Sequence, residues 1–384
     1  MAFNRDRRML LAGLGAAGAL ALTRTAAQAG SCAASGPLSP TGPTMRDLYD
    51  KIAREDEGLA EARTPITSLP SSVTAQFSIT APGVYYLTGN VTGVAGLACI
   101  EVLADEVEIE CDGFTFFGVP NTGACIVTPS PQRAIGVYDA GFSEWPNTCI
   151  EFSLSSHCYV EECWFSLCSG GASGVCLLGG GGTVDDCNVL SCANGRVAVG
   201  SNGIIEECLS VDSGGGCFYS PGPAVMEDNF AINNLGTGIT IDQGGVVIGN
   251  RLVNVRGVVI GTGSVVAEND FASCPGTAIT VTGSRCNVEE NHVAGGAAGV
   301  LVLSPAESVM VDGNNICVSS TAVTISAGTS RCTVVRNAVS VPGGVPAFSI
   351  DAASSYGTIV DATGGGEIGA ATGGVVSPLA NLLY

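Results

Sequence analysis

One short repeat constrains the fold of this chain more than any other feature. Between Cys158 and Val339 a pattern recurs nine times. Each copy contains a Cys or Asn, which we call the reference residue, and an apolar residue three positions before it. The reference residues follow one another at intervals of 19 to 24 residues: Cys163, Cys187, Cys208, Asn229, Asn250, Asn269, Asn291, Asn314 and Asn337. Units this short cannot bury an apolar face alone, so they have to stack as a solenoid.

Each unit also contains short apolar runs with a period of two, such as Gly238-Ile-Thr-Ile, separated by Gly, Asn and Ser turns. These runs are typical of strands. Coils stacked about 4.8 Å apart would pair each strand with its equivalents and enclose an apolar bore. A leucine-rich repeat of similar period would need regular leucines and room for a helix, and the units offer neither.

The reference residue suits one fixed turn of each coil. Asn tolerates left-handed backbone, and its amide can bond to the Asn of the next coil. Small, semi-apolar Cys can replace it at a buried corner. The pattern therefore predicts an all-β fold, a right-handed parallel β-helix of about eleven or twelve coils, with an Asn ladder along one turn.

Composition excludes several function classes. The chain has 384 residues, 54 of them Gly, and a net charge of −20, and Lys51 is its single lysine. Nucleic acids and anionic membrane surfaces both require basic patches, so neither is an expected partner. No stretch after the N-terminus is long and apolar enough to span a membrane.

The N-terminal region predicts export. A basic segment, an apolar run and Ala27-Gln-Ala29 form a signal peptide over residues 1–29, and Arg7-Arg8 favours the twin-arginine route over an ordinary secretory signal. We therefore expect a periplasmic, cell-surface or extracellular protein.

Three further segments follow the signal peptide. Residues 30–75 form a linker and an N-terminal capping helix near Met45–Arg54, with Thr44 as its N-cap. The β-helix is expected over 76–356, and 357–384 form a C-terminal cap. The helix would shield the open strand edge of the first coil.

The opening of the solenoid resembles a known family. Pro82-Gly-Val-Tyr-Tyr-Leu-Thr-Gly-Asn-Val-Thr-Gly93 is followed by Ile100-Glu-Val102 and Ile109-Glu-Cys-Asp-Gly-Phe-Thr115. This succession is similar to the start of secreted bacterial right-handed parallel β-helix repeat proteins, which have a pectate-lyase-like fold. The resemblance implies the fold, but no reaction, because the family has no established activity. Asp112 and the three ladder cysteines depart from it, since Asn is common there.

An acidic column accompanies the ladder. Glu162, Asp186, Glu207 and Asp228 each precede a reference residue, so stacking would place these carboxylates about 5 Å apart. Oxygen-rich clusters suit Ca²⁺, which makes the four residues candidate metal ligands. Glu207 and Asp228 are also candidates for a catalytic acid and base. The alternative is a solvated polar face beside a turn.

An aromatic section gives the second candidate site. Tyr138, Glu144 and Trp145 mix aromatic rings with a carboxylate, as a sugar site would, and Trp145 lies in a Glu-Trp-Pro-Asn turn that we expect at the surface. Aromatic stacking inside the bore is the alternative, and we expect it for Phe165.

The cysteines and histidines give no further candidate site. Twelve of the 17 cysteines lie between Cys99 and Cys217, and we expect mostly reduced, buried stacks, although adjacent coils could be bridged. His157 and His292 are expected to be lone polar residues.

Two functions remain open from the sequence. The first is a secreted, non-catalytic β-helix protein that interacts with extracellular polysaccharide or serves as a structural or adhesive rod. The alternative is a polysaccharide lyase or glycoside hydrolase that uses the acidic column, with Ca²⁺ as its candidate cofactor.

Overall fold

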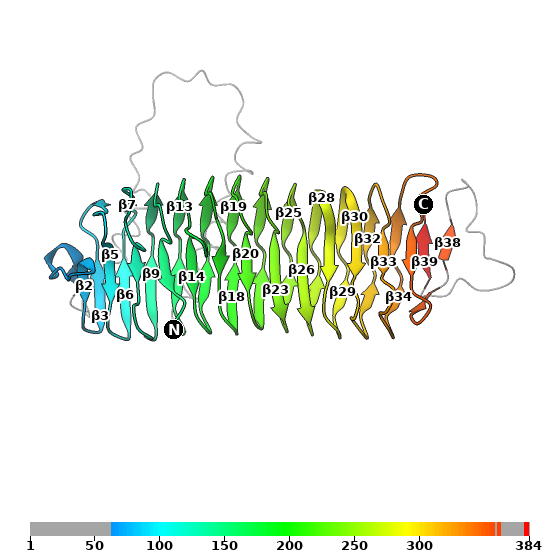
Figure 1. The fold of residues 1–384 in the computed structure, drawn as a ribbon, viewed down its shortest axis with the longest axis horizontal. Coiled ribbons are helices and arrows are strands. Elements are labelled where there is room, and N and C mark those ends of the chain that lie inside the picture. The colour runs from blue at the N-terminus through cyan, green and yellow to red at the C-terminus, as the bar shows by residue number, and fades with distance from the viewer. Residues whose placement is uncertain (1–62, 358, 362–379, 384) are drawn as a thin grey trace, which may run out of the picture. The chain divides into compact units, whose positions relative to one another are not determined.

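Short parallel strands stacked along one axis make up the described part of the protein (Figure 1). The structure is a computed structural model that describes residues 63–357, 359–361 and 380–383. All of these belong to the unit formed by residues 61–384. Every strand pair is parallel and joins equivalent positions of consecutive coils, which confirms the parallel β-helix.

The strands form three faces. The first face is a 14-stranded sheet. Its strands, in spatial order, are β1 (Thr64–Pro65), β3 (Gly83–Tyr86), β6 (Val107–Glu110), β9 (Ile135–Tyr138), β12 (Tyr159–Glu161), β15 (Thr183–Asp185), β18 (Gly203–Glu206), β21 (Ala224–Glu227), β24 (Val246–Ile248), β27 (Val265–Ala267), β29 (Asn287–Glu289), β31 (Met310–Asp312), β34 (Thr333–Val335) and β37 (Ser355–Tyr356).

The second face follows the reference turn. It contains β4 (Val91–Thr92), β7 (Thr115–Phe117), β10 (Gly141–Ser143), β13 (Trp164–Ser166), β16 (Asn188–Leu190), β19 (Leu209–Val211), β22 (Phe230–Ile232), β25 (Arg251–Val253), the first halves of β28 (Asp270–Val281) and β30 (His292–Val302), β32 (Asn315–Cys317), β35 (Ala338–Ser340), β39 (Asn381–Leu383) and β38 (Ile359–Asp361).

The third face closes each coil. It contains β2 (Ala75–Ile79), β5 (Ala98–Val102), β8 (Ile126–Val127), β11 (Ile150–Phe152), β14 (Cys176–Leu178), β17 (Val197–Ala198), β20 (Phe218–Ser220), β23 (Ile239–Gln243), β26 (Val258–Thr262), the second halves of β28 and β30, β33 (Val323–Ile325) and β36 (Phe348–Ile350). In β28 and β30 one continuous strand runs from the second face to the third.

The ends of the solenoid differ from the expectation. The 14 strands of the first face exceed the predicted eleven or twelve coils. Strand β1 lies upstream of residue 76, where we expected the β-helix to begin. The described residues contain one short 3-10 helix, Ile66–Ser68, and the predicted signal peptide and capping helix lie outside them.

The bore is apolar, as the repeat predicts. The residues three positions before the ladder, such as Val160, Val184 and Ile205, are fully buried. Phe142 stacks between Phe116 and Phe165, with ring centroids 5.3 and 5.0 Å apart. The expected core position of Phe165 is thereby confirmed.

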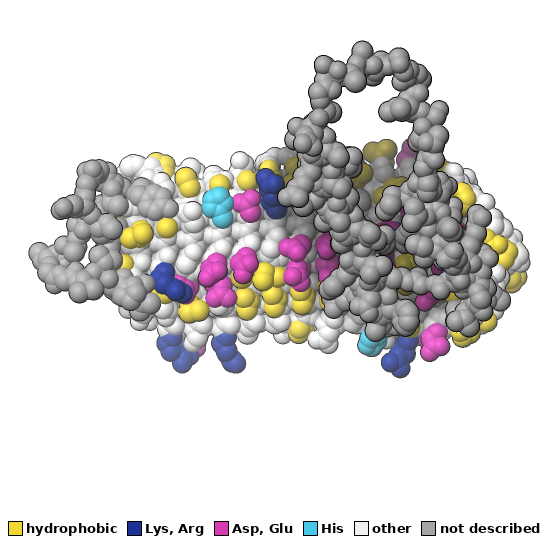
Figure 2. Space-filling view, turned by 180° about the vertical axis from the view of Figure 1, so that it is seen from behind, with side chains coloured by type: hydrophobic (Ala, Val, Ile, Leu, Met, Phe, Trp, Pro, Cys, Tyr) yellow, Lys and Arg dark blue, Asp and Glu magenta, His cyan; other side chains and the backbone are white. Residues whose placement is uncertain are grey.

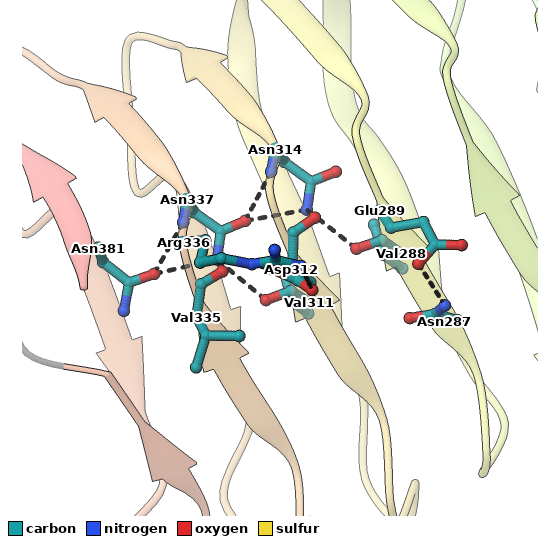
Figure 3. Close-up of polar contacts among 10 residues, drawn as sticks. All are labelled: Asn287, Val288, Glu289, Val311, Asp312, Asn314, Val335, Arg336, Asn337 and Asn381. Carbon is teal, nitrogen blue, oxygen red and sulfur yellow. Dashed lines mark hydrogen bonds and ion pairs between the residues drawn. The ribbon is translucent and has the colours of Figure 1, made fainter. Parts of the chain in front are cut away.

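The Asn ladder is continuous from Asn229 onward. From Asn250 on, each side-chain oxygen accepts two hydrogen bonds from the preceding ladder residue; at Asn337 the donors are the backbone N and Nδ2 of Asn314, at 3.0 and 2.9 Å (Figure 3). The ladder ends on Asn381, whose Oδ1 accepts from Asn337 at 3.0 and 3.1 Å. Asn381 lies in the predicted C-terminal cap, so this cap adds the last rung.

Candidate functional site

The acidic column occupies the turn between the first and second faces. Its residues have left-handed backbone, with φ of 55° at Glu162, 48° at Asp186, 52° at Glu207 and 53° at Asp228. Gly249 and Gly313 take the same position in later coils, with φ of 68° and 66°. This conformation turns the following ladder residue into the bore and leaves the carboxylate exposed.

The column continues along the solenoid. Figure 2 shows acidic side chains in a row beside a band of hydrophobic ones. Further on, Glu268 and Glu290 occupy the same turn position and are exposed. The row ends at Arg336, whose Nε lies 2.7 Å from Oδ1 of Asp312 on the preceding coil (Figure 3).

A second set of polar side chains stands on the first face itself. Glu110, Tyr138, Glu161, Asp185 and Glu206 are in register on consecutive strands and alternate with the inward core residues. Asp185 and Glu161 are only 3% and 6% exposed, and Tyr159 donates a hydrogen bond of 3.0 Å to Oδ2 of Asp185. The early coils therefore carry two adjacent columns of carboxylates, one in the turn and one on the first face.

Two tyrosines lie among these carboxylates. The rings of Tyr138 and Tyr159 have centroids 5.9 Å apart and are tilted by 38°. Tyr138 lies over Gly136, where a β-carbon would come within 2.5 Å of the ring, so only glycine leaves room for it. Burial, with a smaller contribution from Glu108, raises the pKa of Tyr138 to about 12, so it remains a neutral hydroxyl.

The expected surface position of Trp145 is wrong. Trp145 is fully buried, and its Nε1 donates a 3.0 Å hydrogen bond to the carbonyl oxygen of Gly123. The physical reason is the left-handed residue before it: Glu144, with φ of 54°, turns outward and directs the indole into the bore. Gly93 makes room there, since a β-carbon would lie 2.8 Å from the indole.

The three predicted substrate-binding residues are therefore not brought together. Tyr138 points outward from the first face, Trp145 fills the bore, and Glu144 is exposed at the far end of β10. The other tryptophan, Trp164, is the half-buried one on the outward side of the second face, where it lies against Gly141.

The predicted metal ligands form a line. Glu162, Asp186, Glu207 and Asp228 follow one another on consecutive coils. Among the residues that the structure describes, no three His, Cys, Asp or Glu side chains come together as a metal site would need. Glu207 and Asp228, the catalytic candidates, are exposed neighbours in this line.

Sequence reasoning missed an interacting row on the second face. Asp270 Oδ1 lies 2.9 Å from Nδ1 of His292, and Asp270 Oδ2 lies 3.4 Å from Nε of Arg251. His292 is therefore not the lone polar residue that we expected. The signal was present: each of the three residues directly follows a ladder Asn, one repeat apart.

Within the described ranges, no helix is long and apolar enough to cross a membrane. All described cysteines except Cys317 are buried, and none of them forms a disulfide.

Comparison with known proteins assigns no family to this chain. No family model matches the chain, and no curated protein matches it either. Among solved structures, it is similar to the catalytic unit of a GH87 alpha-1,3-glucanase from Streptomyces thermodiastaticus, with 13% identity over 78% of this chain and 69% of that chain and a TM-score of 0.44.

Two other solved structures are similar at the same level. The surface adhesin PfbA of Streptococcus pneumoniae is 11% identical over 88% of this chain and 96% of that chain, with a TM-score of 0.43. A tailspike protein mutant of E. coli bacteriophage HK620, solved with a pentasaccharide, is 11% identical over 85% and 77%, with a TM-score of 0.44. The parallel β-helix is assigned from the strand pairing of this chain itself.

Proposed function

We propose that this protein is an exported β-helix protein that binds an extended, uncharged extracellular glycan along its first face, without cleaving the glycan. One observation carries the proposal: Tyr138 and Tyr159 project from neighbouring strands of that face, with ring centroids 5.9 Å apart, among in-register carboxylates. Aromatic rings offer apolar area to sugar rings, and the exposed turn carboxylates that border the face, such as Glu162 and Asp186, can accept hydrogen bonds from sugar hydroxyls.

The repeat favours a polymer as the ligand. Successive coils present equivalent groups about every 4.8 Å along the axis. A linear chain of sugars can follow such a surface and contact several coils at once. Weak contacts at each coil then add up, as in other multivalent binding.

Charge favours an uncharged glycan. The protein has a net charge of −20, and the exposed turn carboxylates Glu162, Asp186, Glu207 and Asp228 border the first face. An acidic polysaccharide would be repelled unless cations bridged the two surfaces. Ca²⁺ held by these four residues could provide such a bridge, so we keep it as a second, testable mode.

Co-sedimentation with insoluble polysaccharides tests the proposal. We expect an uncharged polymer to retain the protein, and Tyr138→Ala to weaken retention about 3- to 10-fold, the range for losing one aromatic contact. Tyr219→Ala is the matched control, because Tyr219 is a half-buried, outward tyrosine of the third face, bonded to Asp242. Equal loss in both variants, or no retention by any uncharged polymer, would refute the proposal.

The same incubation tests the enzymatic alternative. A lyase or hydrolase that uses Glu207 and Asp228 would create new chain ends, and these would disappear on addition of chelator if Ca²⁺ takes part. Retention that requires Ca²⁺, without new chain ends, would instead assign the acidic column to bridging.

A further inference from the structure

Three outward side chains on consecutive coils of the second face interlock around Asp270. Its Oδ1 lies 2.9 Å from Nδ1 of His292, and its Oδ2 lies 3.4 Å from Nε of Arg251. The guanidinium of Arg251 also lies over the ring of Phe230, 5.3 Å from its centroid. Phe230, Arg251, Asp270 and His292 are in register on β22, β25, β28 and β30.

Asp270 orients the imidazole of His292. An ionised carboxylate only accepts hydrogen bonds, so the neutral imidazole carries its proton on Nδ1 and donates it to Oδ1. The lone pair is then on Nε2, the nitrogen that points away from Asp270. With 54% of the His292 side chain exposed, this basic nitrogen is accessible to solvent.

The surroundings favour a proton acceptor. Glu268 and Glu290, both exposed, stand two residues before Asp270 and His292. On the other side, Asn315 of β32 is in register with His292, and Cys317 follows it on the same strand. Among the described residues, the carboxylate in direct contact with the ring is that of Asp270, and this contact leaves Nε2 free to take up a proton. The positive charge of Arg251 is balanced by its own contact with Asp270.

We propose that His292 is a general base that activates water for the hydrolysis of carboxylic esters, with Asp270 as a positioning residue. The water oxygen attacks the ester carbonyl carbon while its proton moves to Nε2. The bond from this carbon to the alcohol oxygen then breaks, and the proton passes from Nε2 to the departing alkoxide. The products are one carboxylic acid and one alcohol, with no change in oxidation state.

Arg251 supplies a second group for this reaction. Its guanidinium is held by Phe230 and Asp270 and still has donors on its two terminal nitrogens. An ester bound over Asp270 would place its carbonyl oxygen toward these donors, which would stabilise the oxyanion that develops there. The inference is independent of glycan binding, since an unattached ester is sufficient to test it.

The full chain should hydrolyse 4-nitrophenyl acetate, and His292→Gln should lower the rate at least about tenfold, the low end of what a general base contributes. His157→Gln is the matched control, because His157 is exposed and has no carboxylate contact among the described residues. Equal rates for the parent and His292→Gln would overturn the proposal. An equal loss in the two histidine variants, or hydrolysis no faster than buffer, would overturn it as well.

Asp270→Asn separates positioning from a merely structural role. An amide cannot fix the same tautomer, so kcat for the ester should fall while KM stays unchanged. An unchanged kcat in Asp270→Asn, or a rise in KM with the same kcat, would remove Asp270 from the proposal. Circular dichroism of each variant verifies that the strands remain folded.

Discussion

The ladder has a cysteine half, formed by Cys163, Cys187 and Cys208, and an asparagine half from Asn229 onward. The two halves satisfy the backbone groups of the same turn with different side chains. In the asparagine half, Nδ2 of Asn250 donates to the carbonyl oxygens of Ile248 at 2.9 Å and Met226 at 2.8 Å. In the cysteine half, Sγ of Cys187 donates to the equivalent oxygen of Asp185 at 3.2 Å and lies 3.8 Å from that of Val160. A thiol therefore points at the same two carbonyl groups as an amide.

The two halves also provide equivalent acceptors for the backbone N–H of each ladder residue. The backbone N–H of Asn250 donates to Oδ1 of Asn269 at 2.9 Å. In the cysteine half the backbone N–H of Cys163 is directed at the sulfur of Cys187, and that of Cys187 at the sulfur of Cys208. The two halves meet at Cys208, whose N–H donates to Oδ1 of Asn229 at 3.0 Å.

This comparison shows that the turn needs one donor and one acceptor rather than an amide as such. The halves nevertheless differ in strength and in response to pH. Sulfur is a weak donor and a weak acceptor, whereas an amide is strong in both roles. A thiol can also lose its proton, and an amide cannot.

Alkaline pH should distinguish the halves most strongly. Burial raises the pKa of Cys163 and Cys208 well above the usual value, and that of Cys217 to about 12. Unfolded thiols titrate near pH 8.5, so their contribution to stability is complete below that pH and is lost as the pH rises toward the folded pKa. Each such thiol should cost about 1.4 kcal/mol per pH unit above about pH 8.5.

With so many buried thiols, we expect the cysteine half to unfold between about pH 9 and 11 while the asparagine half keeps its strands longer. Alkylation followed by mass spectrometry measures this residue by residue. Cys317, which is exposed, should react throughout and serves as the internal control. Simultaneous exposure of Cys163 and Cys332 at one pH would show that the halves unfold together and not separately.

Removing one amide should be the next largest effect. Asn269→Leu leaves the backbone N–H of Asn250 without its acceptor and takes away one of the three acceptors of Asn250 Nδ2. It also removes the donor to the carbonyls of Val247 and Ala267. Buried polar groups without partners cost about 1–3 kcal/mol each, so we expect about 3–5 kcal/mol of lost stability. The midpoint of denaturant unfolding reports the change.

Cys187→Ala is the counterpart in the other half. It removes a weak donor and a buried sulfur, so its cost should be smaller, about 1–3 kcal/mol. A cysteine variant that loses as much stability as Asn269→Leu would contradict the difference in strength between the halves.

What could be predicted from sequence follows from the repeat. Inward positions such as Val160 and ladder positions such as Asn250 recur every coil, so periodicity alone identifies them. Asn381 was missed because it lies 44 residues beyond Asn337, at an interval outside the pattern. Trp145 was misplaced because the left-handed backbone of Glu144 inverts the expected direction, and glutamate does not usually indicate that conformation.

The candidate sites were harder to predict for a related reason. The pair of Asp270 and His292 exists only once the register of neighbouring coils is known, since 22 residues separate them in the chain. Tyr138 and Tyr159 became neighbours in the same way. Repeats predict which residues stack, but contacts between side chains depend on rotamers and on gaps such as that above Gly136.

Extending the amide ladder by one coil should have the smallest effect. In Cys208→Asn the new side-chain oxygen would accept the N–H of Cys187, and its nitrogen would donate to Oδ1 of Asn229, as Nδ2 of Asn229 does to Asn250 at 3.0 Å. The gain from stronger hydrogen bonds should offset crowding next to Cys187, so we expect a change within about 1 kcal/mol. Cys208→Leu, which can make neither bond, should cost more, about 2–3 kcal/mol. The denaturant midpoints of the two variants measure these changes in stability. If Cys208→Asn loses as much stability as Cys208→Leu, this turn accepts a thiol for its size and not for its hydrogen bonds.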